Sequence, residues 1–183
     1  MTASRIRLLN ALGLLGISLI LYIGFAIEFL YDELPCPLCL LQRVGFVFVM
    51  IGFMLNVMQG AKPINYGVVL VGALFGATMS LRQIAMHAIP GTGAYGSPIF
   101  GYHFYTWAFI IFVATIFGVA VLLLLTRDVI AISDEPLSGF YKLICWIAMV
   151  IVGFLVVMTF IECGPWECPG DPVNYWLFHQ GGG

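Results

Sequence analysis

Two pairs of closely spaced cysteines are the residues of this sequence that could do chemistry. Cys36 and Cys39 form a Cys-x-x-Cys pair within the segment LPCPLCLLQR, and Cys163 and Cys168 lie within the segment ECGPWECP. Two neighbouring thiols can be oxidised to a disulfide and reduced again, so each pair can release or take up two electrons. The spacing therefore predicts thiol–disulfide chemistry, with all four cysteines as catalytic candidates.

The residues around the first pair favour a reactive thiolate. Pro37 suits the first position of a helix because it has no backbone N–H to leave unpaired. A helix that begins there puts Cys36 near its N-cap and Cys39 in its first turn, where unpaired N–H groups and the helix dipole stabilise a thiolate. Arg43 lies four residues after Cys39, on the same helix face, and adds a permanent positive charge. We interpret Arg43 as a functional cation rather than as a side chain that only extends to lipid headgroups.

Composition places these cysteines in a membrane protein. The 183 residues are 62% hydrophobic and 9% charged, and their mean hydropathy is +1.05. A soluble domain of this size carries much more charge. The seven Lys and Arg residues are scattered, so a nucleic-acid partner is not expected. The composition predicts an all-α, polytopic membrane helix bundle that forms one integral membrane domain over residues 1–183, with lipid around it.

Five stretches are long and apolar enough to cross a bilayer core, which takes about 20 helical residues. The first resembles the apolar region of a signal peptide but has no convincing cleavage site, so we expect a retained helix. The expected helices cover residues 8–27, 44–61, 63–87, 104–126 and 143–161, and residues 162–183 form an outer C-terminal tail.

Basic residues orient the predicted bundle, because loops on the cytoplasmic side of a membrane carry an excess of Lys and Arg. Five of the seven lie on the side of the N-terminus: Arg5, Arg7, Lys62, Arg127 and Lys142. We therefore expect the N-terminus in the cytoplasm and the C-terminus outside. Arg43 and Arg82 break the pattern at the predicted outer ends of their helices, which makes both functional candidates.

The same orientation sorts the cysteines by compartment. It places both pairs on the outer, oxidising side, which is where disulfide chemistry occurs. The fifth cysteine, Cys145, falls in the inner part of the last predicted span, among apolar residues. We interpret it as a packing residue.

Two alternatives to redox chemistry stay open at this point. The four outer thiolates could together bind zinc tetrahedrally, although a Cys-x4-Cys limb is wider than the common spacing and an outward site would compete with oxidation. Either pair could instead be a structural disulfide. The strained ring of a Cys-x-x-Cys disulfide argues against this for the first pair, whereas for Cys163 and Cys168 it remains an alternative.

The segment PCPLCLLQR resembles the signature of the DsbB family, the quinone-reducing membrane proteins that generate disulfides. Members have a Cys-x-x-Cys after the first helix and an Arg four residues past the second Cys. A second segment, RQIAMHAIP, which contains Arg82 and His87, is similar to the segment that closes the third helix of the family. The resemblance covers approximately residues 8–126 and implies a four-helix DsbB-like core, to which this chain adds a fifth helix.

The sequence departs from the family in the position of its second cysteine pair. Members usually carry that pair in the long outer loop between the third and fourth helices. Here this loop, AIPGTGAYGSPIFGYH, contains no cysteine. The Cys163 and Cys168 pair follows the fifth helix on the same predicted side, and we expect it to take the place of the missing pair.

The resemblance implies a relay of electrons in the bacterial inner membrane, with the C-terminus in the periplasm. A periplasmic thioredoxin-fold oxidase of the DsbA kind would be reoxidised by Cys163 and Cys168. The electrons would pass to Cys36 and Cys39 and then to ubiquinone or menaquinone, with Cys39 as the nearer contact and no metal involved. The implied quinone-binding residues are Arg43, Arg82 and His87. The chain would thus be a thiol:quinone oxidoreductase.

Two other functions are weighed against this one. A non-catalytic membrane subunit of a larger complex could keep the helical scaffold and use the second cysteine pair only to pin its tail. The presence of Cys36, Cys39 and Arg43 counts against this, since a scaffold needs none of them. A vitamin-K-type quinone reductase would use similar thiol and quinone sites in a different physiological role.

Overall fold

The computed structural model describes residues 2–31, 34–88, 96, 98–125, 137–165, 168 and 175–179. These residues form only helices and one isolated β-bridge. The helices are α1 (Ala3–Tyr31), α2 (Pro37–Gln59), α3 (Pro63–His87), α4 (Phe104–Leu125), α5 (Gly139–Cys163) and the short α6 (Trp176–His179). The first five are long and apolar enough to cross a membrane. The predicted all-α bundle is confirmed, and the chain is a multi-pass membrane protein.

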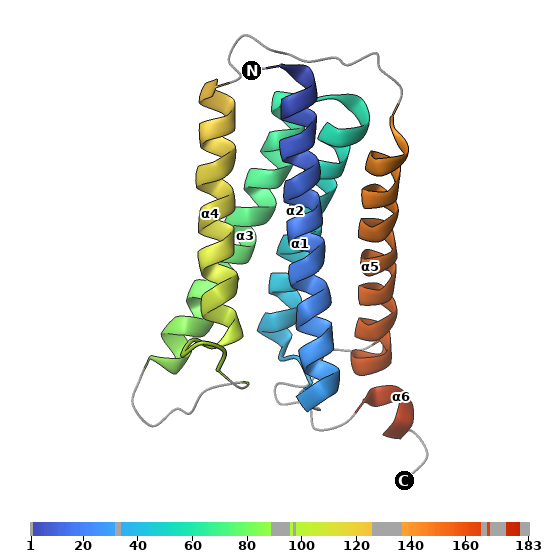
Figure 1. The fold of residues 1–183 in the computed structure, drawn as a ribbon. Helices are drawn as coiled ribbons and strands as arrows, with labels where there is room; N and C mark the ends of the chain where they lie inside the picture. The colour runs from blue at the N-terminus through green and yellow to red at the C-terminus, as the bar shows by residue number, and fades with distance from the viewer. Residues whose placement is uncertain are drawn as a thin grey trace.

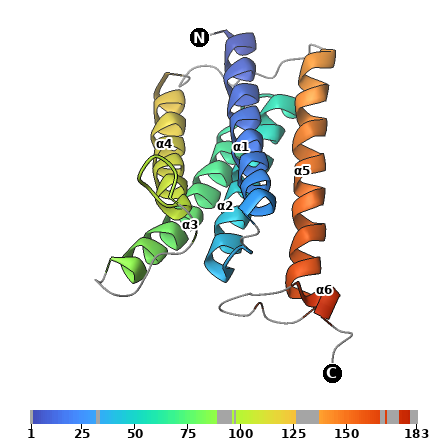
Figure 2. The same ribbon diagram turned by 60° about the horizontal axis from the view of Figure 1, so that its bottom comes forward.

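The long helices stand side by side and alternate in direction, so that the N-terminus and the C-terminus lie at opposite ends (Figure 1). Helix α2 packs against α1 and α3, α3 packs against α4, and α5 packs mainly against α1. Helices α4 and α5 consequently flank the bundle on opposite sides (Figure 2). The first cysteine pair, at the start of α2, and the second, at the end of α5, lie at the same end.

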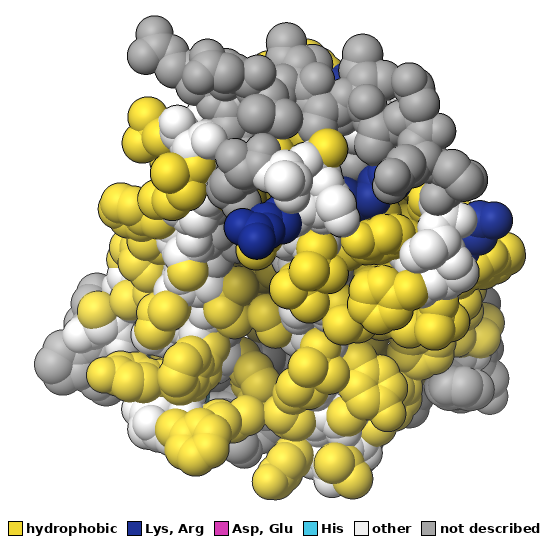
Figure 3. All heavy atoms as spheres, turned by 45° about the horizontal axis from the view of Figure 1, so that its top comes forward, with side chains coloured by type: hydrophobic (Ala, Val, Ile, Leu, Met, Phe, Trp, Pro, Cys, Tyr) yellow, Lys and Arg dark blue, Asp and Glu magenta, His cyan; other side chains and the backbone are white. Residues whose placement is uncertain are grey.

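The outer surface of the bundle is suited to lipid. Hydrophobic side chains cover most of the face shown in Figure 3, and Lys and Arg side chains lie above them. Large apolar residues such as Leu30, Phe117 and Leu124 have exposed fractions of 79%, 69% and 79%. Exposure on this scale is costly in water but not in a hydrocarbon environment.

Small residues let α2 and α3 approach closely and fix the helix that carries the first cysteine pair. A Cβ atom on Gly45 would lie 2.8 Å from the Cα atom of Gly76, and one on Gly76 would overlap the ring of Phe112. That ring stacks on Phe46 of α2, with 4.1 Å between the ring centroids. Close backbone packing of this kind is how helices associate where no water drives them together.

The expected helix boundaries were wrong where charged residues marked them. Helix α2 begins at Pro37, the start that the proline predicted, and not at residue 44, where the expected span begins. Helix α5 covers Gly139–Cys163 rather than 143–161. Arg43 is paired with Glu28 inside the bundle and Glu162 is buried, so α2 and α5 include these residues. Lys142 is exposed on the first turns of α5, where a charged side chain does not end a helix. Cys163 is thus the last residue of a helix and not part of a tail. Arg127 and residues 89–95 and 97 of the loop between α3 and α4 lie outside the described residues.

Candidate functional site

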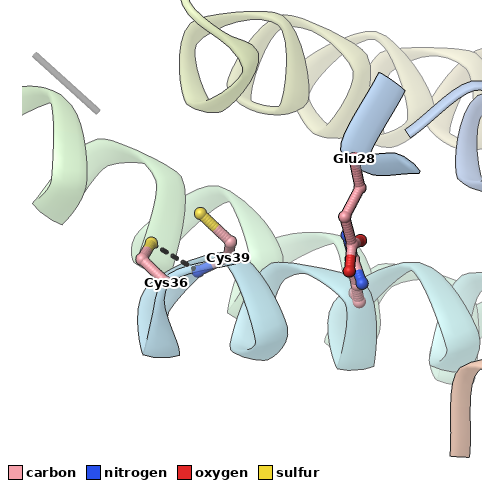
Figure 4. A network of polar contacts seen from close by, with 4 residues as sticks. Glu28, Cys36 and Cys39 are labelled. Atoms are coloured by element: carbon pink, nitrogen blue, oxygen red, sulfur yellow. Dashed lines mark hydrogen bonds and ion pairs between the residues drawn. The ribbon is translucent and has the colours of Figure 1, made fainter. Parts of the chain in front are cut away.

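The first cysteine pair is held by the start of α2. Cys36 is the N-cap residue, with an extended backbone, and Pro37 occupies the first turn. The backbone N–H of Cys39 donates a hydrogen bond to the Cys36 sulfur at 3.2 Å (Figure 4). A sulfur in this position satisfies one of the N–H groups that a helix start leaves unpaired. The predicted N-cap and first-turn positions of the two cysteines are confirmed.

A buried amide on α3 faces both sulfurs. The Nε2 atom of Gln83 lies 3.2 Å from the sulfur of Cys36 and 3.6 Å from that of Cys39. Its Oε1 atom accepts a hydrogen bond of 2.6 Å from Gln42 of α2. This bond fixes the orientation of the Gln83 amide, so its N–H groups point at the sulfurs. Sequence reasoning missed both glutamines, although Gln83 lies inside the segment that suggested Arg82 and His87.

Hydrogen bonds lower the pKa of Cys36. The value falls from the ordinary 9.0 to about 7, chiefly because the Cys39 side chain donates a hydrogen bond to it. Burial acts in the opposite direction, whereas the Cys39 and Leu38 backbone and the Gln83 side chain lower the pKa further. A group with this pKa is about half thiolate at neutral pH, and the thiolate is the form that reacts in disulfide exchange.

Arg43 is paired rather than free. Its Nη2 atom lies 2.6 Å from Oε2 of Glu28 on α1, and its guanidinium carbon lies 4.6 Å from the centroid of the Phe25 ring. Figure 4 shows Glu28 extending from α1 toward the helix that carries the two cysteines. The signal for Glu28 was present in the sequence as an acid at the end of an apolar span, where an ionisable side chain is a functional candidate.

A partly open cavity of about 150 Å³ lies between α1, α2 and α4, next to the first cysteine pair. Most of its wall is apolar. Its polar lining consists of Glu28, Cys39, Gln42 and Arg43, and its aromatic lining consists of Phe46, Phe104, Tyr105 and Trp107. Cys39 therefore lines the cavity, whereas Cys36 is not part of its wall.

The structure does not bring Arg82 or His87 into this cavity. Arg82 is exposed on α3. The His87 ring stacks on Tyr105 at 5.5 Å, and Tyr105 also stacks on His103 at 5.4 Å. His87 is thus one ring away from the cavity wall, and the quinone-binding roles of both residues stay predictions.

The second pair is a disulfide between Cys163 and Cys168, whereas Cys36 and Cys39 are free thiols. Paired sulfurs are not the thiolates that a four-cysteine zinc site requires. Cys163 is buried at the end of α5, next to the buried Glu162. The Glu162 carboxyl interacts electrostatically with Glu28, Arg43 and Cys39, so the end of α5 adjoins the first pair. Cys145 lies in the hydrophobic core.

Comparison with known proteins points to one family. A family model described as "Disulfide bond formation protein DsbB" matches residues 6–125. A "Disulfide bond formation protein B" of Chromobacterium violaceum is 35% identical over 74 residues, which are 37% of this chain and 45% of that protein. One of Hahella chejuensis is 29% identical over 90 residues, 46% of this chain and 53% of that protein. The chain thus spans about half the length of these relatives. No solved structure matches.

Proposed function

Because this chain belongs to the DsbB family of disulfide bond formation proteins, we propose that it generates disulfide bonds as a thiol:quinone oxidoreductase. One observation carries the proposal. Cys39 lines an apolar cavity inside the bundle, and its partner Cys36 has a pKa of about 7. A dithiol whose one sulfur is partly ionised and whose other sulfur faces an apolar cavity is suited to giving electrons to a flat apolar acceptor.

The cavity wall fits a quinone ring. Its aromatic side chains offer flat apolar surfaces, and Arg43 supplies N–H donors for a carbonyl oxygen. A quinone, when bound, accepts two electrons and two protons. Cys39 is the sulfur that would contact it, and Cys36 would complete the disulfide. The acceptor would be ubiquinone or menaquinone, and Arg82 and His87 are candidates for contacts outside the cavity wall.

The electrons would enter through the second pair. A reduced thioredoxin-fold oxidase of the DsbA kind would attack the Cys163–Cys168 disulfide, forming a mixed disulfide and releasing one cysteine. The second thiol of the partner would then close the partner's own disulfide, leaving Cys163 and Cys168 reduced. These two thiols would exchange with an oxidised Cys36–Cys39 pair and pass on the same two electrons. The electrostatic contact of Glu162 with Cys39 supports this short route.

The proposed location is the bacterial inner membrane. The helix ends that carry Arg5, Lys62 and Lys142 lie together at the N-terminal end of the bundle. An excess of basic residues at one end favours the cytoplasmic side. The two cysteine pairs would then face the periplasm, where a DsbA-like partner is available.

Quinone reduction by the purified protein tests the proposal. The protein would receive a reduced DsbA-like oxidase and either a short-chain ubiquinone or a short-chain menaquinone, and wild type would be compared with Cys36→Ser, Cys163→Ser and the control Cys145→Ser. We expect activity in wild type and in the control, and loss of activity in the other two variants. Loss in Cys36→Ser alone would mean that the second pair is only a structural disulfide. A native wild type without activity toward either quinone would contradict the proposal and favour a scaffold role.

A further inference from the structure

Three charged side chains from three helices meet beside the cavity. Glu28 of α1 and Glu162 of α5 have exposed fractions of 5% and 3%, and the side chain of Arg43 on α2 is 15% exposed. Glu28 is bonded to Arg43 at 2.6 Å. Glu162 interacts electrostatically with both of them and with Cys39. Among the described residues, its Oε1 atom has no hydrogen-bond partner.

The cluster contains one fixed positive charge and two carboxyl groups. Arg43 balances one carboxylate, and a second buried carboxylate would have no counter-ion. An uncompensated buried charge is costly, so a buried carboxyl in this situation keeps its proton. The ion pair occupies Glu28, which leaves Glu162 as the group that carries the proton. The groups that act electrostatically on the Glu162 carboxyl are Glu28, Arg43 and Cys39, and Cys39 adds no positive charge to them.

The proposed reaction needs a proton from such a group. Reduction of a quinone to a quinol takes two electrons and two protons. In the state in which Cys36 is a thiolate, the thiolate and the Cys39 thiol supply two electrons when they form their disulfide, but only one proton. The second proton must come from another acid near the cavity.

We propose that Glu162 and Glu28 together store this second proton and deliver it to the cavity. The inference rests on the proposed quinone reduction and adds a role for α5, which lies outside the region of the family match. Glu162 releases its proton toward Glu28, and Glu28, which lines the cavity beside Arg43, passes it on. The reaction balances in charge: one negative charge leaves the Cys36 thiolate and one appears on the Glu28–Glu162 pair.

The position of Glu162 also connects the two cysteine pairs. It precedes Cys163 of the second pair and interacts with Cys39 of the first. The Glu162 carboxyl therefore lies between the two pairs, where the thiols of the second pair release protons when they reduce the first pair. Reduction of the first pair would restore the stored proton before the next quinone binds.

Infrared spectroscopy of the protein without quinone tests the stored proton directly. At neutral pH we expect the carbonyl band of a protonated, buried carboxylic acid in wild type and its absence in Glu162→Gln. Glutamine has nearly the same shape and carries no charge, so the variant is expected to fold. Cys145→Ser, on the same helix but in the core, serves as the matched control and is expected to keep the band. A wild type without the band, or a Glu162→Gln variant that retains it, would overturn the proposal.

Single-turnover kinetics test the delivery of the proton. Wild type and Glu162→Gln, both with Cys36 and Cys39 reduced in advance, would be mixed with a short-chain ubiquinone. General acids contribute about 100-fold or more to such steps, so we expect the rate in Glu162→Gln to fall about 100-fold. Glu162→Asp is expected to recover part of it. Equal rates in wild type and Glu162→Gln would refute the proton store alone, whereas no reduction by wild type would refute the proposed function.

Discussion

At the scale of single residues, the chemistry of the first pair depends on an amide that belongs to another helix. Gln83 faces both sulfurs from α3, and Gln42 fixes its orientation. The sulfur of Cys36 therefore receives donors from its own helix and from a neighbour. Such donors, first the Cys39 side chain and then the Cys39 backbone and Gln83, stabilise a thiolate more than a thiol and lower the Cys36 pKa to about 7.

The reactivity of Cys36 should follow this pKa. In the reduced protein, alkylation of Cys36 is expected to rise with pH with a midpoint of about 7, because the thiolate forms above the pKa and is lost as the pH falls below it. Gln83→Leu removes a donor and is expected to shift the midpoint upward. Iodoacetamide labelling at a series of pH values, read by mass spectrometry of the Cys36 peptide, measures the shift.

Ser80→Ala provides the control for this measurement. Ser80 is buried on α3 near Gln83, but its hydroxyl donates to the Gly76 carbonyl oxygen and not to a sulfur. Its removal is expected to leave the midpoint unchanged. A wild-type midpoint near 9, the ordinary value of a free thiol, would contradict the proposed donor arrangement.

Removing the cation from the buried ion pair should lower the free energy of unfolding more than removing both charges of the pair. Arg43→Gln leaves Glu28 buried without its counter-ion, and we expect a loss of about 3 kcal/mol in the free energy of unfolding. The double variant Glu28→Gln/Arg43→Gln leaves no buried charge on the pair and should be less destabilised. Denaturant unfolding in detergent micelles compares the two, and a double variant that is no more stable than Arg43→Gln would contradict this account.

At the scale of the helices, the site depends on how closely α2 and α3 approach. Glycines at their contact allow the two backbones to touch, and this contact sets the distance from Gln83 to the cysteines at the start of α2. The cavity is formed in a different way. It lies where α4 packs on α3 and leaves space beside α1 and α2.

Gly45→Ala tests the close contact. The added Cβ would lie 2.8 Å from the Cα atom of Gly76, too close for two carbon atoms, so the helices must move apart. We expect a loss of about 1–3 kcal/mol in unfolding free energy. Gly118→Ala on α4 is the matched control, because a Cβ there meets no atom within 4 Å. Equal stability of the two variants in a thermal unfolding assay would show that the contact is not tight.

At the scale of the whole molecule, an odd number of spans places the two chain ends at opposite ends of the bundle. It also places the two cysteine pairs at the same end. Among the described residues, five helices can cross a membrane, and Figure 1 shows the N-terminus and the C-terminus at opposite ends. Only with α5 in place does the second pair reach the end of the bundle where α2 begins. The additional helix thus supplies both the second pair and the buried Glu162.

Labelling across the membrane tests this arrangement. In a variant with all five cysteines replaced by Ser, a single cysteine would be introduced at Ser4 or at Leu177, which are both exposed. In intact spheroplasts, a membrane-impermeant maleimide is expected to label the Leu177→Cys protein and not the Ser4→Cys protein. Labelling of both should appear once the membrane is permeabilised. The reverse pattern in intact spheroplasts would invert the proposed orientation.

Much of the architecture follows from local properties of the sequence. Long apolar stretches predicted the five spans. Pro37 predicted where the second helix begins, and thereby that Cys36 is near its N-cap. Both signals depend on residues close together in the chain, so neither needs a tertiary structure. Charged residues were the source of error. Arg43 and Lys142 were taken as limits of apolar spans, but α2 includes Arg43, which is paired with Glu28 inside the bundle, and α5 includes Lys142, which is exposed on its surface.

What the sequence by itself determined is the class of protein, its spans and the residues able to do redox chemistry. The tertiary structure decided which groups surround those residues. Gln83 is 47 positions from Cys36, and Glu28 and Glu162 come from two other helices. Such contacts depend on the rotation and separation of packed helices, which hydropathy and helical periodicity do not specify. For this reason the pair of glutamines, the buried carboxyls and the cavity emerged only when the helices were placed together.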